Sequence, residues 1–317
     1  MSGLKTRLLN LALRSETITI ALFLTDNALA TLGLSRANPA PQEHLSGETV
    51  EADVTYARQV VSSYSMYGAA KGRVAEIGPG GSAATALLLI DEGADTVALL
   101  DRFVFPHDPE LLGRTYHAII QRSPKLTALF PDPTDLHSRI TFESGEPAAA
   151  EQYFARNGNF DAVCSCAVLE HVSDPILALE SMTAALKTGG VLVHYVDFRD
   201  HGMFTSSGKH ELTFLKVASW LYPHMSRRRG RPNRVLIDRY RTACDRLGLD
   251  YEILATSLVG PGSLPAPIAY EKVPEGLRSA AEARVEEIRP KLAMPFRSMD
   301  ARDLAIDSIV LVARKRQ

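Results

Sequence analysis

One short polar block carries the residue types best suited to proton transfer. Residues 194–201 read His-Tyr-Val-Asp-Phe-Arg-Asp-His, and a Glu-His pair precedes them. Imidazoles and carboxylates exchange protons near neutral pH, so a hydroxyl held here can be deprotonated as it reacts. We predict that His201 is the general base, that Asp200 or Asp197 orients its ring, and that His171 is the next candidate for the base.

The same block admits two other interpretations. His194, Asp197 and His201 could ligate a hard divalent cation such as magnesium or manganese. Their spacing is not a recognised zinc pattern, and we predict no metal. The Asp-Arg-Asp-His run could also be a surface cluster of charges that neutralise one another. The sequence leaves these alternatives open.

A glycine-rich turn lies upstream of this block. Residues 74–82 read Val-Ala-Glu-Ile-Gly-Pro-Gly-Gly-Ser, and glycines let a backbone approach a ligand closely. Gly78 and Gly80 alone are compatible with a dinucleotide site. Glu76 favours another cofactor, because its carboxylate would repel a pyrophosphate and attract an ammonium group. Asp101 ends the next apolar run, roughly 20 residues later, where an acid can accept both hydroxyls of a ribose.

Further blocks follow in the order found in one enzyme family. With the Glu-x-Gly-x-Gly turn, they resemble the class I (Rossmann-like) S-adenosylmethionine-dependent methyltransferases, and they are Gly145-Glu146, the apolar run 160–165, Leu169-Glu170-His171-Val172 and Lys187-Thr188-Gly189-Gly190. Ser82 stands where many members have a third glycine. The resemblance implies that S-adenosylmethionine is the cofactor and that Glu146 accepts from its adenine amino group. The implied cofactor-binding residues are Glu76, Gly78, Pro79, Gly80, Ser82, Asp101, Arg102, Gly145, Glu146, Ser165 and Cys166.

A narrower resemblance concerns the acceptor. Residues 197–201 and 233–240 are similar to an Asp-Leu-Arg-Asp-His block and a downstream Asn-Arg-(Leu/Val)-x-x-x-x-Tyr pattern in a bacterial methyltransferase group, with Phe198 in place of the leucine. Several members of that group are associated with surface glycans or secondary metabolites. The resemblance therefore implies O-methylation of a small-molecule, sugar or glycolipid hydroxyl.

The elements that position these residues alternate along the chain. Apolar runs at 74–77, 96–100, 140–142, 162–165 and 191–195 are separated by helix-like segments, and two more follow at 251–256 and 308–313. Such alternation predicts an α/β fold with a mostly parallel sheet and helices on both faces. The family resemblance implies seven strands.

We predict two parts of the chain. Residues 1–70 form a helical cap, with two short helices within 4–34, a proline-containing break at 38–47 and a helix at 51–67. Residues 71–317 form the methyltransferase domain. An insertion at about 201–247 is predicted to be an acceptor-binding lid, because long loops in compact domains are commonly functional. Its basic run, Arg227–Arg234, either grips an anionic group of the acceptor or is a solvated loop.

Composition excludes several classes of protein. The 35 Lys and Arg nearly balance the 37 Asp and Glu, so no general field favours nucleic acid, and the expected partner is a small-molecule or glycan acceptor. Cys164, Cys166 and Cys244 suggest neither disulfides nor zinc, and the first two are interpreted as core residues. We expect a soluble, cytoplasmic protein without a membrane span. The sequence does not decide between a monomer and a homodimer.

Two rival functions remain at this point. An NAD(P)-dependent oxidoreductase or epimerase would require a Tyr-x-x-x-Lys pair after the fourth strand, whereas Tyr67 and Lys71 precede the glycine turn. A non-catalytic partner subunit with the same fold would not need the intact glycine turn, Asp101 and Glu146.

Overall fold

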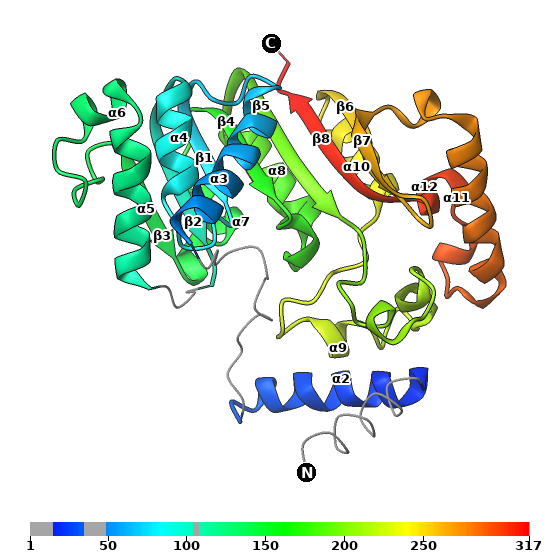
Figure 1. The fold of residues 1–317 in the computed structure, drawn as a ribbon. Coiled ribbons are helices and arrows are strands. Elements are labelled where there is room, and N and C mark those ends of the chain that lie inside the picture. Colours follow the sequence, from blue (N-terminus) through cyan, green and yellow to red (C-terminus); the bar gives the residue numbers. More distant parts are fainter. Residues whose placement is uncertain (1–14, 35–48, 104–107, 317) are drawn as a thin grey trace.

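A single mixed sheet forms the centre of the molecule in a computed structural model that describes residues 15–34, 49–103 and 108–316 (Figure 1). Within this part of the chain the sheet has eight strands in the order β3-β2-β1-β4-β5-β8-β6-β7. The strands are β1 (Gly72–Ile77), β2 (Ala94–Asp101), β3 (Ile140–Ser144), β4 (Phe160–Cys166), β5 (Leu186–Asp197), β6 (Asp250–Leu258), β7 (Gly262–Ile268) and β8 (Ile306–Arg314).

The predicted α/β class and its seven apolar strands are confirmed. Strands β1 to β5 pair in parallel, and β8 pairs antiparallel with both β5 and β6. The eighth strand, β7, was not predicted. It pairs only with β6 among the described strands, reads Gly-Ser-Leu-Pro-Ala-Pro-Ile and buries little of its surface. Prolines cannot donate to a ladder and are confined to sheet edges, so this sequence does not read as a strand.

Helices cover both faces of the sheet (Figure 1). The helices with bounds are α2 (Glu16–Thr31), α3 (Val50–Ser65), α4 (Ala84–Glu92), α5 (Pro109–Gln121), α6 (Pro124–Leu129), α7 (Ala150–Phe154), α8 (Pro175–Ala185), α9 (Pro223–Ser226), α10 (Ile237–Arg246), α11 (Glu275–Ile288) and α12 (Ala301–Ala305). Helices α3 to α6 pack on one face, whereas α7, α8 and α10 pack on the other.

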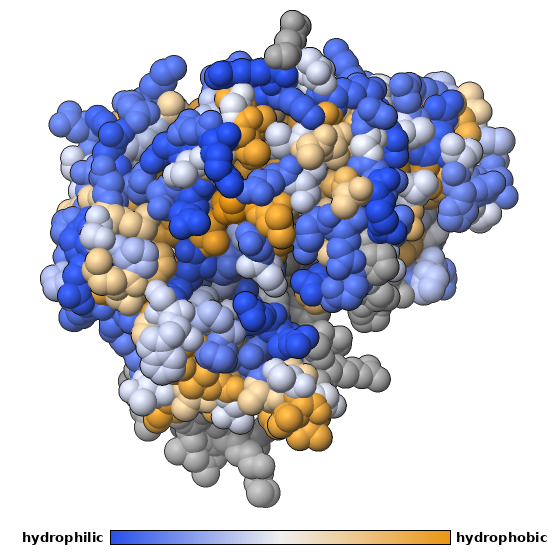
Figure 2. All heavy atoms as spheres, turned by 180° about the vertical axis from the view of Figure 1, so that it is seen from behind, coloured by the Kyte–Doolittle hydropathy of each residue, from blue (hydrophilic) through white to orange (hydrophobic). Residues whose placement is uncertain are grey.

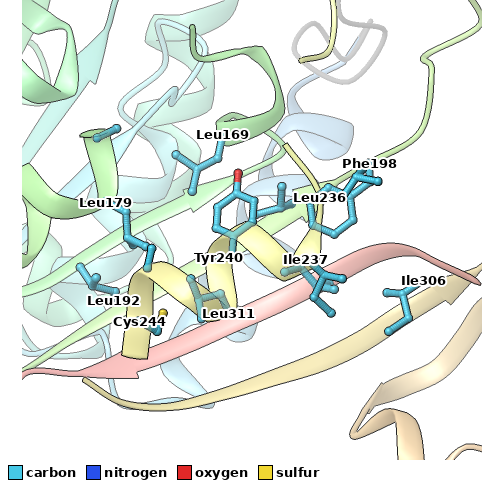
Figure 3. Close-up of a cluster of buried hydrophobic side chains, with 14 of the residues drawn as sticks. Leu169, Leu179, Leu192, Phe198, Leu236, Ile237, Tyr240, Cys244, Ile306 and Leu311 are labelled. Carbon is cyan, nitrogen blue, oxygen red and sulfur yellow. The ribbon is translucent and has the colours of Figure 1, made fainter. Parts of the chain in front are cut away.

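Each face of the sheet has its own apolar core. Figure 3 shows part of the first core, in which Leu179 of α8 and Cys244 of α10 lie over Leu192 of β5 and Leu311 of β8. The second core lies beneath α3 and α4 and includes Cys164, and Cys166 packs against it. Both cysteines are therefore core residues, as interpreted. Because α3 contributes to this core, it is part of the layer that supports the glycine turn.

The described part of the N-terminal region contains two helices that behave differently. Residues 4–13 and the break at 38–47 lie outside the described residues. Helix α3 begins after Thr49, whose side chain accepts from the Ala52 amide, and packs against α4. Helix α2 instead packs against α9 of the insertion. The boundary at residue 70 stays a prediction.

Ion pairs attach α2 to the basic run of the insertion. Asp26 accepts hydrogen bonds from the guanidinium groups of Arg229 and Arg231, and Arg231 also lies 4.5 Å above the ring of Phe23. Burial raises the pKa of Asp26, but these two arginines outweigh it and hold that pKa below its usual value. Arg229 and Arg231 of the basic run therefore hold helix α2 against the insertion.

The remaining surface of α2 is largely apolar. Figure 2 shows apolar side chains at the lower end of the molecule, where α2 lies in Figure 1. The exposed large side chains on and just after this helix are Ile18, Leu22, Leu29, Leu32 and Leu34. The ion pairs at Asp26 thus hold an otherwise apolar helix at a defined place on the insertion.

Replacing Asp26 with Ala should loosen α2 from the insertion. We expect faster hydrogen exchange within residues 16–31, little change in the sheet, and a loss of about 1 kcal/mol in the free energy of unfolding, since the carboxylate is partly exposed. Asp250→Ala, which removes an exposed carboxylate from β6, is the control. Unchanged exchange in α2 would show that the ion pairs do not hold it.

Candidate functional site

A pocket opens at the carboxyl ends of β1, β2 and β4. Strands β2 and β4 flank β1, so the order of the chain reverses at this point, which is where parallel α/β sheets bind ligands. Its lining residues are Ile77, Gly78, Leu100, Asp101, Arg102, Phe103, Ala148, Ala149, Ala150, Glu151, Ala167, Val168, Leu169, His171, Val172 and Gly230. The pocket thus joins the end of β2 to the 169–172 turn and the insertion.

The turn after β1 requires glycine at its first position. Gly78 has a φ of 72°, and a Cβ added there would lie 2.4 Å from Cγ2 of Val168. Its amide donates to the carbonyl of Leu100 across the sheet at 2.8 Å. A side chain at position 78 would collide with Val168, which lines the pocket. Glycine at this position therefore lets Val168 keep its place in the pocket wall.

Asp101 is fixed at the edge of the pocket by backbone amides. One carboxylate oxygen accepts from the Gly80 amide at 3.1 Å and the other from the Phe103 amide at 2.9 Å. Burial raises the pKa of Asp101 to about 6. Carboxylate oxygens can each accept more than one hydrogen bond, so the oriented group keeps acceptor capacity for ribose hydroxyls.

Glu76 faces the helix layer instead of the pocket. Its carboxyl oxygens accept from the hydroxyls of Tyr64 on α3, at 3.2 Å, and of Thr85 on α4. Burial raises its pKa to about 7, so at neutral pH it carries only part of its charge. The expected attraction for an ammonium group stays a prediction. Tyr64 and Thr85 were not predicted, although Tyr64 falls on the helix expected at 51–67.

Only some of the remaining residues that were predicted to bind the cofactor line the pocket. Arg102 lines it and pairs with Glu146 at 2.8 Å, both partly exposed. Gly145 donates its amide to the Asp101 carbonyl at 3.0 Å. The others are outside the lining: Pro79 is buried in the turn, the Ser82 hydroxyl accepts from the Ala84 amide, the Ser165 hydroxyl bonds to His194, and Cys166 packs in the second core.

Two imidazoles meet where the pocket reaches the polar block. The rings of His171 and His201 form an edge-to-face pair with centroids 4.8 Å apart. Nε2 of His201 lies 3.6 Å from Oδ2 of Asp197 and 3.9 Å from Oε1 of Glu170. Burial and, second, the charge of His201 lower the pKa of His171 to about 4, so that ring is neutral near pH 7.

The structure distinguishes the two acids expected behind His201. Asp197 is the one that lies beside its ring. Asp200 is buried and accepts from the amides of Gly202, Phe204 and Thr205 and from the Thr205 hydroxyl. These contacts organise the loop after β5. Any role of Asp200 in catalysis would have to act through that loop.

His194 does not join the other two residues of the alternative metal set. Its ring is fully buried, its Nδ1 lies 2.8 Å from the Ser165 hydroxyl, and burial lowers its pKa to about 3. Asp197 and His201 do lie together. The structure therefore brings together two of those three residues, and Glu170 and His171 also lie beside His201.

The insertion is attached to the pocket through Asn233. Its side-chain amide donates to the carbonyls of Leu169 and Val172, at 2.8 and 2.9 Å, and its backbone amide donates to the carbonyl of Glu170. Arg234 stacks 4.1 Å above the Tyr222 ring and donates to a carbonyl of the insertion. The basic run is thus largely engaged in packing.

A second pocket adjoins the first along the insertion. Its lining residues are His171, Val172, Ser173, Tyr222, Pro223, Ser226, Arg227, Gly230, Arg231, Asn233, Arg234, Val235 and Phe296. His171, Val172 and Gly230 line both pockets. The two pockets are therefore neighbours that have these three residues in common.

Asp101 should make binding of S-adenosylmethionine depend on pH. An acid with a pKa of about 6 is neutral below that pH and accepts hydrogen bonds less strongly, so affinity should fall as the pH drops from 7.5 to 5. At pH 7.5, Asp101→Ala should weaken binding by roughly 1.5 to 3 kcal/mol. Asp101→Asn should remove the step near pH 6.

Calorimetric titration over this pH range is the measurement, and Asp95→Ala, an exposed carboxylate on the same strand, is the control. Equal affinities for the wild type and Asp101→Ala would show that the carboxylate does not contact the cofactor.

Comparisons with known proteins agree with this geometry. The chain matches the family described as "Methyltransferase domain" over residues 50–252, more than half of its length. No curated protein matches its sequence. Among the described helices, none is long and apolar enough to cross a membrane.

Solved structures of similar shape include three methyltransferases. The S-adenosylmethionine-dependent methyltransferase of Mesorhizobium loti is 14% identical, with a TM-score of 0.42 over 84% of this chain and 99% of that one. Phosphoethanolamine N-methyltransferase 2 of Haemonchus contortus, bound to S-adenosyl-L-methionine, is 14% identical, with a TM-score of 0.43 over 82% and 53%. The N-methyltransferase NodS of Bradyrhizobium japonicum, bound to S-adenosyl-L-homocysteine, is 14% identical, with a TM-score of 0.38 over 84% and 88%.

Structural similarity at 14% sequence identity does not identify the acceptor. The family match covers the glycine turn, Asp101, the 169–172 turn and the polar block, and the strands carry these residues to one edge of the sheet. The chain belongs to the class I S-adenosylmethionine-dependent methyltransferases.

Proposed function

We propose that this methyltransferase transfers the methyl group to an oxygen of a small-molecule, sugar or glycolipid hydroxyl. The observation that carries the proposal is that the cofactor pocket and the second pocket share His171, Val172 and Gly230. Methyl transfer needs donor and acceptor in line and in contact, so the acceptor is expected in a pocket next to that of the cofactor. The insertion and α2 then act as the cover of the acceptor side.

His201 is the proton acceptor in the metal-free protein. A neutral hydroxyl is a weak nucleophile, so removing its proton as the methyl group arrives assists the reaction. Burial pushes the pKa of Asp197 up, but the hydrogen bonds and charge of Arg199 hold it below its usual value. Asp197 therefore stays ionised, orients the His201 ring and stabilises the imidazolium that forms.

The second pocket favours a neutral, hydroxyl-bearing acceptor. Tyr222 and Phe296 line this pocket as buried side chains. Arg231 is already paired with Asp26, and Arg234 stacks on the two aromatic rings. An uncharged acceptor would leave the pairing of Arg231 with Asp26 intact.

Replacing His201 with Ala should lower kcat by about a hundredfold and leave the affinity for S-adenosylmethionine nearly unchanged, because the base acts only in the chemical step. His201→Gln should not restore activity. In the wild type, kcat should rise with pH as the His201 imidazole loses its proton, because only the neutral ring can act as the base. The assay follows S-adenosylhomocysteine formation by mass spectrometry with a panel of glycosides and phenols, after chelator treatment.

His137→Ala, which removes an exposed imidazole far along the chain from this block, is the matched control. Full activity in both His201 variants would place the base elsewhere, and His171 would be tested next. Binding of the cofactor without turnover of any acceptor would support a non-catalytic subunit instead.

A further inference from the structure

We propose that Glu170, His171 and His201 form a binding site for a divalent transition-metal ion. Among the residues that the structure describes, a carboxylate oxygen of Glu170 and one ring nitrogen from each histidine lie within 4.8 Å of one another. The sequence did not predict these three side chains as a set of metal ligands. The set differs from the one considered from the sequence, because Glu170 and His171 take the places of His194 and Asp197.

Buried polar atoms without partners support the site. Within the described part of the chain, Oε2 of Glu170 and both ring nitrogens of His171 have no hydrogen-bond partner, and the Glu170 side chain is 1% exposed. A buried carboxylate oxygen or imidazole nitrogen left unpaired is costly. A carboxylate oxygen and one nitrogen of a neutral imidazole each carry a lone pair, so one cation would satisfy Oε2 of Glu170 and one ring nitrogen of His171 together.

The distances leave room for an ion. Nε2 of His201 is 3.9 Å from Oε1 of Glu170. Metal bonds of about 2.0 to 2.2 Å place neighbouring ligand atoms about 3 to 4 Å apart, so small side-chain rotations complete the set. Oδ2 of Asp197 is 3.6 Å from the same nitrogen and is within reach as a further ligand, although Arg199 now holds it.

The supports of these ligands suit a metal site. Oε1 of Glu170 accepts from the Asp197 amide at 3.3 Å, and the Glu170 carbonyl accepts from Asn233. Such contacts fix ligand orientation in metal sites. Two imidazoles with one carboxylate favour zinc, iron or manganese over magnesium or calcium, which prefer oxygen ligands alone.

The location suggests a role for the ion in catalysis. This role rests on the O-methylation proposed above. His171 lines both pockets, so an ion bound to it would lie beside both of them, where it could hold the acceptor oxygen without standing in the path of the methyl group. An acceptor hydroxyl that coordinates the ion loses its proton to solvent more readily. Its oxygen then forms the bond to the methyl carbon, the sulfur–carbon bond breaks with its electron pair passing to sulfur, and S-adenosylhomocysteine is released. In this loaded state His201 is a ligand and takes no proton.

The test measures metal binding without turnover. The full-length protein is stripped with chelator and titrated with Zn²⁺, Mn²⁺ or Mg²⁺ by calorimetry, and bound metal is counted after equilibrium dialysis. We expect about one Zn²⁺ per chain, weaker Mn²⁺ binding in line with the general affinity order, and no saturable Mg²⁺ binding. His171→Ala, His201→Ala and Glu170→Gln should each weaken Zn²⁺ binding at least about tenfold.

His137→Ala should bind Zn²⁺ like the wild type. Affinity for S-adenosylmethionine, measured on each variant, shows that the fold is intact, and His201→Ala is the decisive variant because its side chain is 30% exposed. Equal Zn²⁺ affinity in wild type and His201→Ala, or no saturable Zn²⁺ binding at all, would overturn the site. Neither result bears on the proposed methyltransferase activity, which is measured in a separate assay. Absence of that activity would likewise leave the interpretation of the metal titration unchanged.

Discussion

The attachment of Asn233 to the turn at 169–172 is the interaction on which the site depends. This turn follows β4 at the edge where the cofactor pocket opens, and three of its carbonyls accept from Asn233. Without these bonds the carbonyls would face an open crevice, and nothing in the sheet would bring residue 230 to the pocket. One asparagine therefore joins the first pocket, built by the sheet, to the insertion that lines the second pocket.

Parallel strands made the fold predictable from the sequence, since each buried strand reads as one apolar run. All seven expected runs are strands, and the missed strand β7 carries two prolines. The direction of Glu76 was harder to predict. Alternation along β1 places it on the same face as Val74, over α3 and α4, whereas Ile77 faces the other core. Its carboxyl group accepts from Tyr64 and Thr85, and its expected contact with the ligand stays a prediction.

The polar block shows where sequence reasoning stops. In an extended strand, residues 197 and 201 lie far apart, and Asp200 is the natural neighbour of His201. The backbone of His201 has a φ of 48°, so the chain turns back after β5 and its ring meets Asp197. Contacts between distant segments were equally hidden. The basic run gave no sign that Asp26, about two hundred residues earlier, is its partner.

The second pocket and the packing of the N-terminal helix α2 share one guanidinium group, that of Arg231. Arg231 lines the second pocket, pairs with Asp26 and stacks on Phe23. Its positive charge is already compensated, so an anionic acceptor would have to compete with Asp26 for it, and α2 would loosen as the acceptor bound. A hydroxyl acceptor needs only a hydrogen bond and leaves the pair in place. If the acceptor is the neutral hydroxyl that we propose, the ion pair that keeps α2 on the insertion stays intact while the acceptor binds.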